Sequence, residues 1–472
     1  YKRQVLACFA PEGFAPTSDD CNDFNSSVHP NAPEICDELD NDCGGVVDEG
    51  VTTRFYFDGD LDGFGIVATF IEACIAPDGY SEDSTDCNDN DAQIHPFAPE
   101  RCNFLDDDCN ATSDDGVLLL DADAGNNHSM AICSDGSVWT WGYNNFGQLG
   151  DGTTTQHSSA ITMPSFLGAT MVAGGGWHSL ALKSDGTVWG WGQNNLGQTG
   201  DPASTTTFVP VKVASLSGVV AIAAGTNHSL ALKSDGTVWA WGSNTSGQLG
   251  DGTTTSRTTP VQVSGLTGVV SIAAGDLHSL AVRSDGTAWG WGNNSFYQLG
   301  DGTITPRKTP VQVSGLTNVK EIDGGMTHSV ALKNDGTVWA WGANSAGQLG
   351  DGTTTSRSTP VQVSGLSSVN HVIAGGYHNI ALMPASSVLC WGRNAEGQLG
   401  DGTTTNRTTP VASSGVTSAR EQAAGQYHSF VRRSDQTVWS YGSNNYGQLG
   451  DGTTTNRTSA VTVLGLPHPV PL

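Results

Sequence analysis

A repeat of constant length constrains this chain more than any other feature. A histidine within a Gly-x-x-His element recurs every fifty residues. A unit of this size cannot bury its apolar face alone, so neighbouring units must stack on one another. Residues 117–472 are therefore predicted to form seven equal units. The histidines are His128, His178, His228, His278, His328, His378 and His428.

Each unit contains four short stretches with strand character. In the fourth unit these are residues 269–274, 278–282, 289–292 and 309–313, with an Asp285-Gly286 turn after the second. Gly, Thr and β-branched residues interrupt every window in which a helix would form. Four strands make one blade, so the predicted fold class is all-β, with a closed seven-bladed β-propeller.

The repeat resembles the regulator of chromosome condensation family of propellers. The resemblance rests on A-G-x-x-H-S, on D-G-x-V-W-x-W-G and on G-Q-L-G-D-G, in that order within the repeat. It implies the propeller fold. It leaves function open, because this architecture serves exchange factors, photoreceptors, inhibitors and scaffolds alike.

The recurring histidines and tryptophans have structural and functional interpretations. Aligned histidines could hold a metal ring or relay protons, but a fixed polar residue at a strand start more often satisfies buried groups, and we favour that role. Tryptophan pairs such as Trp289 and Trp291 are interpreted as packing aromatics, one facing each neighbouring blade. No nucleophile is placed beside the histidines, and Cys133 and Cys390 lie in different strands, so we expect no enzyme.

Positions that differ between units indicate where a partner would bind, because residues that only support a blade should converge. The two residues before each histidine vary, and symmetry places them around the axis on one face. Aromatic and Met side chains there would form a protein-binding hot spot, or would plug the channel mouth and touch one another. Both interpretations stay open. The predicted rim is Trp177, Leu277, Met326, Tyr377 and Tyr427.

The first quarter of the chain is acidic and rich in cysteine. Residues 1–116 contain 27 Asp or Glu against 4 Lys or Arg, whereas residues 117–472 contain 20 against 16. Such charge repels nucleic acid and concentrates cations. Eight of the ten cysteines lie in this quarter, which is typical of secreted modules. We therefore expect an extracellular or cell-surface protein that binds no nucleic acid and has no membrane span.

The acidic quarter is a duplication. Residues 8–50 align with residues 74–116 at an offset of 66. We expect a first acidic repeat in 1–50, a second in 51–116 and the propeller in 117–472. Four cysteines per copy permit three pairings, of which we favour sequence neighbours. The predicted disulfides are Cys8–Cys21, Cys36–Cys43, Cys74–Cys87 and Cys102–Cys109.

One loop of the second copy has the spacing of a Ca²⁺ site. Asp58, Asp60 and Asp62 alternate along it, and Gly63 permits the sharp turn. Thr69 stands where an EF-hand has its bidentate Glu, so a remote carboxylate must complete the shell. Oxygen-only ligands favour Ca²⁺ over zinc or copper. The predicted ligands here are Asp58, Asp60, Asp62, the Phe64 carbonyl, Asp86, Asp89 and Asp91.

A second type of acidic cluster occurs in both copies. The predicted ligands are Asp106, Asp108 and Asp114, their counterparts Asp40, Asp42 and Asp48, and also Asp20 and Asp23. His29 and His95 precede proline, and we assign them to turns rather than to a metal. Disulfides and Ca²⁺ would together replace a hydrophobic core.

Residues 1–116 resemble metal-binding repeats of the MopE type. DCNDFN, PEICDELDNDC and VVDEG occur in the order of that repeat. Gly44, Asn110 and Ala111 depart from its pattern, which weakens the prediction of a metal site in the second type of acidic cluster. The counterpart of the Asp58 loop in the first copy would precede residue 1, so we expect a D-x-D-x-D-G segment upstream.

These features predict a secreted, non-enzymatic, Ca²⁺-binding structural or adhesive protein, a subunit of an extracellular filament or surface assembly. Its partner is another protein or a second copy. The alternative is an extracellular protein-binding propeller that acts as an inhibitor or receptor. A GTPase-regulatory propeller ranks third, because acidity and uniform blade length leave no basic tail and no inserted wedge.

Overall fold

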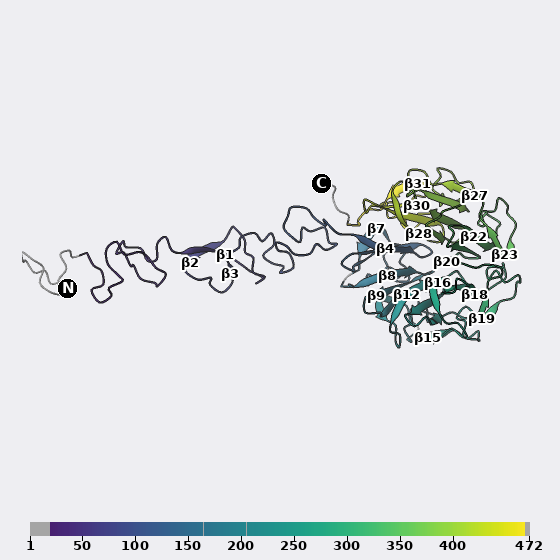
Figure 1. The fold of residues 1–472 in the computed structure, drawn as a ribbon, viewed down its shortest axis with the longest axis horizontal. Helices are drawn as coiled ribbons and strands as arrows, with labels where there is room; N and C mark the ends of the chain where they lie inside the picture. Colours follow the sequence, from purple (N-terminus) through teal and green to yellow (C-terminus); the bar gives the residue numbers. More distant parts are fainter. Residues whose placement is uncertain (1–18, 164, 204, 468–472) are drawn as a thin grey trace, which may run out of the picture. The chain divides into compact units, whose positions relative to one another are not determined.

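The chain folds into two compact units, of which Asp115 ends the first and Gly116 begins the second (Figure 1). The computed structural model describes residues 19–163, 165–203 and 205–467. Within these ranges every regular element is a β-strand. No helix in the described ranges is long and apolar enough to span a membrane.

Unit 1 consists of turns around one small sheet. Strand β1 (Thr53–Phe57) pairs antiparallel with β2 (Phe70–Ala73) and with β3 (Tyr80–Ser81). Phe55 at the centre of the sheet is 2% exposed, whereas Phe24 and Phe97 are exposed. A unit that buries so little apolar surface needs cross-links to stay folded.

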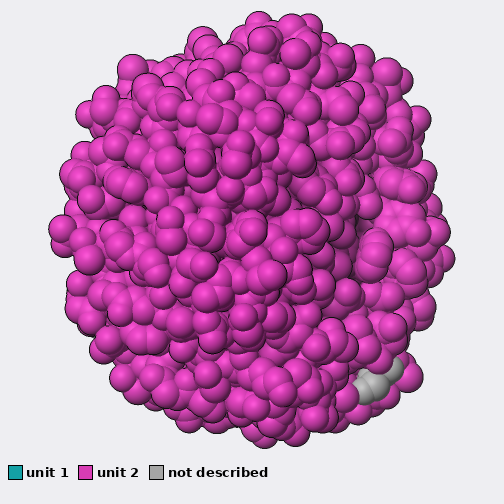
Figure 2. Space-filling view, turned by 90° about the vertical axis from the view of Figure 1, so that its right-hand side faces the viewer, with its two compact units in different colours: residues 1–115, 472 teal, residues 116–471 magenta. Residues whose placement is uncertain are grey.

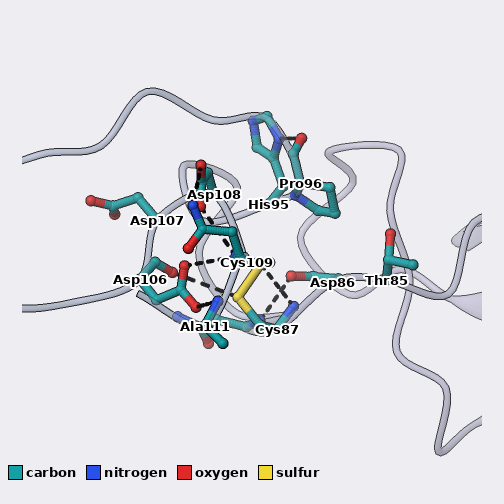
Figure 3. Close-up of a disulfide and its surroundings, with 12 residues drawn as sticks. Thr85, Asp86, Cys87, His95, Pro96, Asp106, Asp107, Asp108, Cys109 and Ala111 are labelled. Carbon is teal, nitrogen blue, oxygen red and sulfur yellow. Dashed lines mark hydrogen bonds between the residues drawn. A yellow bond between two sulfur atoms is a disulfide. The ribbon is translucent and has the colours of Figure 1, made fainter. Parts of the chain in front are cut away.

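Three disulfides of unit 1 contradict the predicted pairing of sequence neighbours. They are Cys21–Cys43, Cys36–Cys74 and Cys87–Cys109, the last drawn in Figure 3. Cys102 is also disulfide-bonded, and Cys8 lies outside the described residues. The predicted bonds Cys36–Cys43, Cys74–Cys87 and Cys102–Cys109 are therefore wrong, and Cys21 is not available to Cys8.

Local turn geometry explains the observed pairing. Cys43 and Cys109 both adopt a positive φ, of 61° and 59°. This conformation directs each sulfur toward the start of its own copy, where the amides of Cys21 and Cys87 contact the sulfurs at 3.1 and 3.2 Å. Cys36 is left to bond Cys74, so a covalent link joins the first copy to the second.

Unit 2 is a propeller of seven four-stranded antiparallel sheets. The fourth blade contains β16 (Val269–Ala274), β17 (His278–Arg283), β18 (Ala288–Gly292) and β19 (Arg307–Gln312). These bounds confirm the predicted strands, with the fourth beginning two residues earlier than expected. Figure 2 shows one face of unit 2 in a space-filling view.

The other blades repeat this order, each from one stretch of chain. Their strands are β4 (Leu119–Ala124), β5 (His128–Cys133), β6 (Val138–Gly142) and β7 (His157–Thr162); β8 (Ala169–Gly174), β9 (His178–Lys183), β10 (Val188–Gly192) and β11 (Thr207–Lys212); β12 (Val219–Ala224), β13 (His228–Lys233), β14 (Val238–Gly242) and β15 (Arg257–Gln262); β20 (Val319–Gly324), β21 (His328–Lys333), β22 (Val338–Gly342) and β23 (Arg357–Gln362); β24 (His371–Ala374), β25 (His378–Leu382), β26 (Val388–Gly392) and β27 (Arg407–Ala412); and β28 (Ala419–Ala424), β29 (His428–Arg433), β30 (Val438–Gly442) and β31 (Arg457–Thr462).

A buried hydrogen-bond latch joins each blade to the next. His178 Nε2 lies 2.9 Å from Ser229 Oγ of the following blade, and Ser229 Oγ donates to the Gln198 carbonyl at 2.7 Å. Because the hydroxyl proton is used there, the histidine must donate from Nε2. Trp241 Nε1 donates to the same carbonyl at 3.0 Å. The structural interpretation of the histidines is confirmed.

The sixth blade shows the same latch with a different partner. There His328 Nε2 lies 3.0 Å from Asn379 Oδ1, and Asn379 Nδ2 donates to the Gln348 carbonyl at 2.8 Å. An amide oxygen only accepts, so the histidine proton is again on Nε2. Asparagine therefore reproduces both halves of the serine latch.

The seventh blade closes onto the first through the same contacts. His428 Nε2 lies 2.9 Å from Ser129 Oγ, and Trp141 Nε1 donates to the Gln448 carbonyl at 2.9 Å. No strand is exchanged between the first and last blades in the described sheets. Closure of the ring therefore depends on these side-chain latches and on backbone bonds, in which the Ala160 amide donates to the Leu464 carbonyl at 2.9 Å and the Gly452 amide donates to the Ser158 carbonyl at 2.8 Å.

Both tryptophans of a pair face the same neighbouring blade. Trp189 and Trp191 are two residues apart on β10, and side chains two apart on a strand share a face. Both pack in one apolar cluster with Ile132 of the preceding blade. The prediction of one tryptophan for each neighbour is wrong, because it ignored this alternation.

Replacing Ser229 by Ala is expected to lower the free energy of unfolding by about 1–3 kcal/mol, because it leaves the buried His178 Nε2–H without a partner. Ser229→Asn copies the arrangement at Asn379 and is expected to recover at least half of this loss. Guanidinium denaturation followed by tryptophan fluorescence measures both variants. An unchanged stability of Ser229→Ala would show that the latch contributes nothing, and equal losses in the two variants would show that asparagine does not replace serine at this position.

Candidate metal centre and aromatic face

The loop between β1 and β2 gathers three carboxylates. Asp58, Asp60 and Asp62 place ligand oxygens within 4.8 Å of one another, as their alternate spacing predicts. Asp58 holds the turn by accepting from the Leu61 amide at 2.7 Å and the Gly63 amide at 3.1 Å. Gly63 has a φ of 99°, which only glycine adopts without strain.

Asp86 brings a further carboxylate to this loop from the start of the next disulfide-closed segment. Burial, followed by repulsion from Asp62 and Asp86, raises the pKa of Asp60 above its ordinary value of 3.8. Asp86 is 9% exposed, and burial raises its pKa as well. Within the described chain, both oxygens of Asp60 and Oδ2 of Asp86 are buried without a hydrogen-bond partner. Buried carboxylate oxygens that lack donors are the environment that a cation neutralises.

The remaining predicted residues of this loop have mixed roles. Asp89 Oδ1 accepts from the Gly59 amide at 2.7 Å and so borders the loop, whereas Asp91 accepts from Gln93 in the following turn. The Phe64 amide donates to Asp62 at 2.8 Å, and its ring stacks on His95 at a centroid distance of 5.2 Å.

Each copy also contains the second type of acidic cluster. Glu34, Asp40, Asp42 and Glu49 converge in the first copy, and Glu100, Asp106 and Asp108 in the second. Sequence reasoning missed the three glutamates, although Glu34 and Glu100 recur in both copies at the same offset. Glu34 accepts from the Asp42 and Asp48 amides at 2.7 and 3.1 Å, which fixes its carboxylate at the cluster.

Other predicted residues hold turns outside these groups. Asp48 and Asp114 are buried and accept from the backbone amides of Asp37 and Asn103. Asp20 accepts from the Asn22 amide, and Asp23 is exposed.

The two histidines of unit 1 occupy equivalent turns. The His29 amide donates to the Asn41 carbonyl at 2.9 Å, and the His95 amide donates to the Asp107 carbonyl at 3.0 Å. Figure 3 shows the His95 ring turned to the Pro96 carbonyl. Both residues therefore have the turn role that their position before proline predicts.

All of these groups offer carboxylate oxygens. The sulfurs of Cys87 and Cys109 beside Asp86 are used in a disulfide. Hard oxygen donors suit a hard divalent cation and disfavour thiophilic metals. The carboxylate groups of unit 1 therefore fit the metal-binding role that their pattern predicts.

The propeller carries a run of aromatic side chains across three blades. Trp177 packs against Phe146 at 6.0 Å, Phe146 against Tyr143 at 6.3 Å, and Tyr143 against Tyr446 at 4.7 Å between ring centroids. Tyr446 is exposed, and the other three rings are half-buried. We call these four residues the aromatic run.

A second aromatic group lies between blades six and seven. Tyr377 and Tyr427 stack at 5.8 Å, and the Arg393 guanidinium lies 5.3 Å from the centroid of Tyr427. Arg393 also pairs with Glu396 at 2.7 Å. We call Tyr377, Tyr427 and Arg393 the tyrosine stack.

The predicted rim is therefore not one ring of equivalent residues. Met326 contacts Gln426 Nε2 at 3.0 Å and lines the central channel, and Leu277 has no ring neighbour among the described aromatic contacts. Sequence reasoning missed Tyr143, Phe146 and Tyr446. Tyr143 stands where the fifth blade has Ala343, and Phe146 and Tyr446 share a repeat position that is Ser246 in the third blade and Phe296 in the fourth. This variation between blades could have found them.

The central channel is a cavity of about 350 Å³ lined by the first strand of every blade. Three aspartates on these strands accept backbone amides of the following blade, at 2.8 to 2.9 Å. Burial raises the pKa of Asp121 to about 7, of Asp123 to about 8 and of Asp323 to about 6. These carboxyl groups therefore take up protons between about pH 8 and about pH 6, well above the range of an ordinary aspartate.

Comparison with known proteins finds matching family models in both units. The family model described as the RCC1-like domain matches residues 99–422, and the regulator of chromosome condensation (RCC1) repeat matches residues 423–448. A motif described as metal-binding, of the MopE type, matches residues 20–49. The matches agree with the resemblance that the repeats suggest.

Solved structures share the propeller fold. Human WBSCR16 is 26% identical with a TM-score of 0.60, and the match covers 65% of this chain and 85% of that one. Prp20p from Saccharomyces cerevisiae is 23% identical with a TM-score of 0.63, covering 71% and 87%. Since the RCC1-like model spans more than half of the sequence, this chain belongs to the family of RCC1-like domain proteins.

Proposed function

We propose that this protein is a secreted, non-enzymatic structural or adhesive protein, in which Ca²⁺-binding modules carry a propeller that binds proteins. The observation that carries the proposal is the aromatic run from Tyr446 to Trp177. Tyr and Trp side chains dominate protein-binding hot spots, because they bury a large area at little entropic cost. The hydrogen-bond latches between blades hold these rings in place, so that binding a partner would order few further groups.

Unit 1 supports an extracellular location and Ca²⁺ as the cation. Its three described disulfides would be reduced in a cytosol. Residues 19–50 contain ten Asp or Glu and no Lys or Arg, so the charge has no protein counter-ion there. Extracellular Ca²⁺ modules bind at about 10⁻⁴ to 10⁻³ M, and we expect affinities in that range.

In the structural version of the proposal, the aromatic run binds a neighbouring subunit, so that copies of the chain assemble into a filament or surface layer. The tyrosine stack supports the alternative, an extracellular inhibitor or receptor-like binder. There Arg393 and Glu396 set a charged pair beside stacked rings, which suits recognition of one particular partner.

Prp20p, one of the similar structures, has binding properties toward Gsp1p and histones. A GTPase-regulatory role for this chain ranks below the other two. The repeat keeps its fifty-residue period through all seven blades, and the net charge of −27 opposes binding to nucleosomal DNA.

The test compares the full chain with Trp177→Ala/Tyr446→Ala in about 10⁻³ M Ca²⁺. Analytical ultracentrifugation at increasing protein concentration should show assembly of the unaltered chain and at least a tenfold weaker association of the variant. Val270→Ala, an exposed position elsewhere, is the matched control and should assemble normally.

A chain that stays monomeric at high concentration would contradict the structural version. Capture of a partner from native extract that Trp177→Ala/Tyr446→Ala abolishes would then favour the binder. Capture unaffected by that variant would contradict both, because the aromatic run would bind nothing.

A further inference from the structure

The wall of the central channel departs from the fifty-residue repeat at a few positions. Asp123 on β4 and Asp323 on β20 both line the channel. Their equivalents on the other blades are Ala173, Ala223, Ala273, Ile373 and Ala423. A residue that only supports a blade should converge across the repeat, so these two carboxyl groups indicate a contact with something in the channel.

The channel aspartates have no basic partner. Glu321 and Glu421, on neighbouring parts of the wall, form ion pairs. No ion pair of the described residues includes Asp121, Asp123 or Asp323. Burial, followed by repulsion from Asp121 and Asp323, raises the pKa of Asp123. Carboxyl groups that repel one another in a buried site are stabilised in their ionised form by a cation.

Gln422 on β28 adds a buried acceptor that has no donor. Its side chain is 5% exposed, although the other six blades carry an apolar residue at this position. Its Nε2 donates to the Ile380 carbonyl at 3.0 Å and to the His371 carbonyl at 3.3 Å, which fixes the orientation of the amide. Its Oε1 is buried and accepts no hydrogen bond within the described chain. A buried acceptor of this kind calls for a donor from outside the protein.

A second cavity connects the aspartates with Gln422. Its volume is about 460 Å³, and Asp121, Glu421 and the apolar Met171 are among its lining residues. The residues that line both this cavity and the channel are Asp123, Val172, His371, Ile373 and Gln422. Both volumes lie in the range of small-ligand sites, roughly 300–1,000 Å³.

The geometry of the channel favours an organic cation over a metal ion. A bare Ca²⁺ needs about six to eight oxygens at about 2.3–2.6 Å. None of the described acidic groups whose oxygens converge within 4.8 Å contains a channel carboxylate. An ammonium or guanidinium group instead donates separate hydrogen bonds to spaced oxygens, while its alkyl chain packs on apolar surface such as the alanines of blades two to four.

We propose that the channel binds an ammonium or guanidinium group on a narrow alkyl chain. Asp121, Asp123 and Asp323 balance its charge, and Gln422 Oε1 accepts a hydrogen bond from it. The group belongs either to a free amine or to a Lys or Arg side chain of another protein. The site uses neither Ca²⁺ nor the aromatic run, so its failure would leave the proposed function intact.

Melting of the full chain with millimolar n-butylammonium chloride tests the site. Tryptophan fluorescence follows the propeller alone, because every tryptophan lies beyond residue 116. At about pH 9, above the pKa values of the three aspartates, their carboxyls are ionised while the amine is still protonated. The amine should raise the melting temperature by several degrees, whereas n-butanol and sodium chloride should not. No shift, or an equal shift with calcium chloride, would overturn the assignment.

Calorimetric titration of variants locates the bound amine. Asp123→Asn/Asp323→Asn keeps the acceptors for the backbone amides and removes two charges, and should weaken binding at least about tenfold. Gln422→Leu restores the apolar character of the other blades and should weaken binding about fivefold. Asp185→Asn/Asp235→Asn removes two exposed carboxylates and is the matched control. Undiminished binding in Asp123→Asn/Asp323→Asn would place the amine elsewhere and overturn the assignment.

Two further probes distinguish the sources of the cation. Spermidine is a free polyamine, whereas tri-lysine with blocked termini presents the same ammonium group from a peptide. Tighter binding of spermidine would assign the site to a free amine, and tighter binding of the peptide would assign it to a side chain of another protein. If neither displaced n-butylammonium, the channel would not accept this chemistry.

Discussion

Acidification from about pH 6.5 to about pH 4 is expected to unfold the propeller cooperatively. Burial lowers the pKa of its seven latch histidines to about 3 or 4, from about 6.5 in an unfolded chain. The folded state therefore excludes protons that the unfolded state binds. Stability is fully present above about pH 6.5 and is lost as pH falls, by about 1.4 kcal/mol per pH unit for each histidine.

Three channel carboxyls oppose this loss. The raised pKa values of Asp121, Asp123 and Asp323 mean that the folded state binds their protons first, which stabilises it as pH falls from about 8. Near pH 5 the unfolded chain then holds about four more protons than the folded one, a slope of about 5 kcal/mol per pH unit. Two units of pH would remove about 10 kcal/mol, comparable to the whole stability of a domain.

Urea denaturation at a series of pH values measures the slope. All thirteen tryptophans lie beyond residue 116, so their fluorescence reports on the propeller alone. The control is the triple variant Asp121→Asn/Asp123→Asn/Asp323→Asn, which keeps the hydrogen-bond acceptors but has no carboxyl groups that titrate. In this variant the unfolding free energy should change more steeply with pH, by up to about three further protons bound on unfolding. If the unaltered chain took up fewer than about two protons on unfolding near pH 5, the histidines would not be held neutral in the folded state.

Reduction combined with chelation is expected to unfold unit 1 and to leave the propeller folded. The disulfides close loops with sequence separations of 22, 38 and 22 residues, each worth about 3–4 kcal/mol in chain entropy. Removing Ca²⁺ adds repulsion among clustered carboxylates that have few donors. The latches and strand pairing of the propeller use neither Ca²⁺ nor these three disulfides, although Cys133 at the end of β5 is itself disulfide-bonded. Cys390 is buried, and burial raises the pKa of its thiol to about 12.

Brief digestion with proteinase K, a serine protease that uses no metal in its chemistry, followed by mass spectrometry locates the unfolded region, while tryptophan fluorescence follows the propeller. EDTA alone should increase cleavage in residues 19–115, and reductant with EDTA should remove this region. Cys21→Ser/Cys43→Ser isolates one disulfide and should give an intermediate result. Indifference to EDTA would contradict the role of Ca²⁺, and resistance after both treatments would show that unit 1 has another source of stability.

Particular residues show what sequence alone can establish in this protein. The spacing of His128 to His428 and the four strand patterns between them predicted seven blades, because strand propensity and turn residues act over a few neighbouring positions. The alternation of Asp58, Asp60 and Asp62 predicted one acidic loop for the same reason. Trp189 and Trp191 could also have been placed on one face, since two-residue alternation is a local property.

Contacts between distant segments were decided by the tertiary structure. Cys36 bonds Cys74 instead of Cys43 because the turn at Cys43 directs its sulfur toward Cys21. Glu34 lies beside Asp40 because two backbone amides fix its carboxylate. Tyr446 contacts Tyr143 because the seventh blade of the propeller closes onto the first. Sequence periodicity determined where the strands of this chain lie. Which distant residues contact one another depends on the direction of the chain at turns and on closure of the ring, because these bring together residues that no local pattern relates.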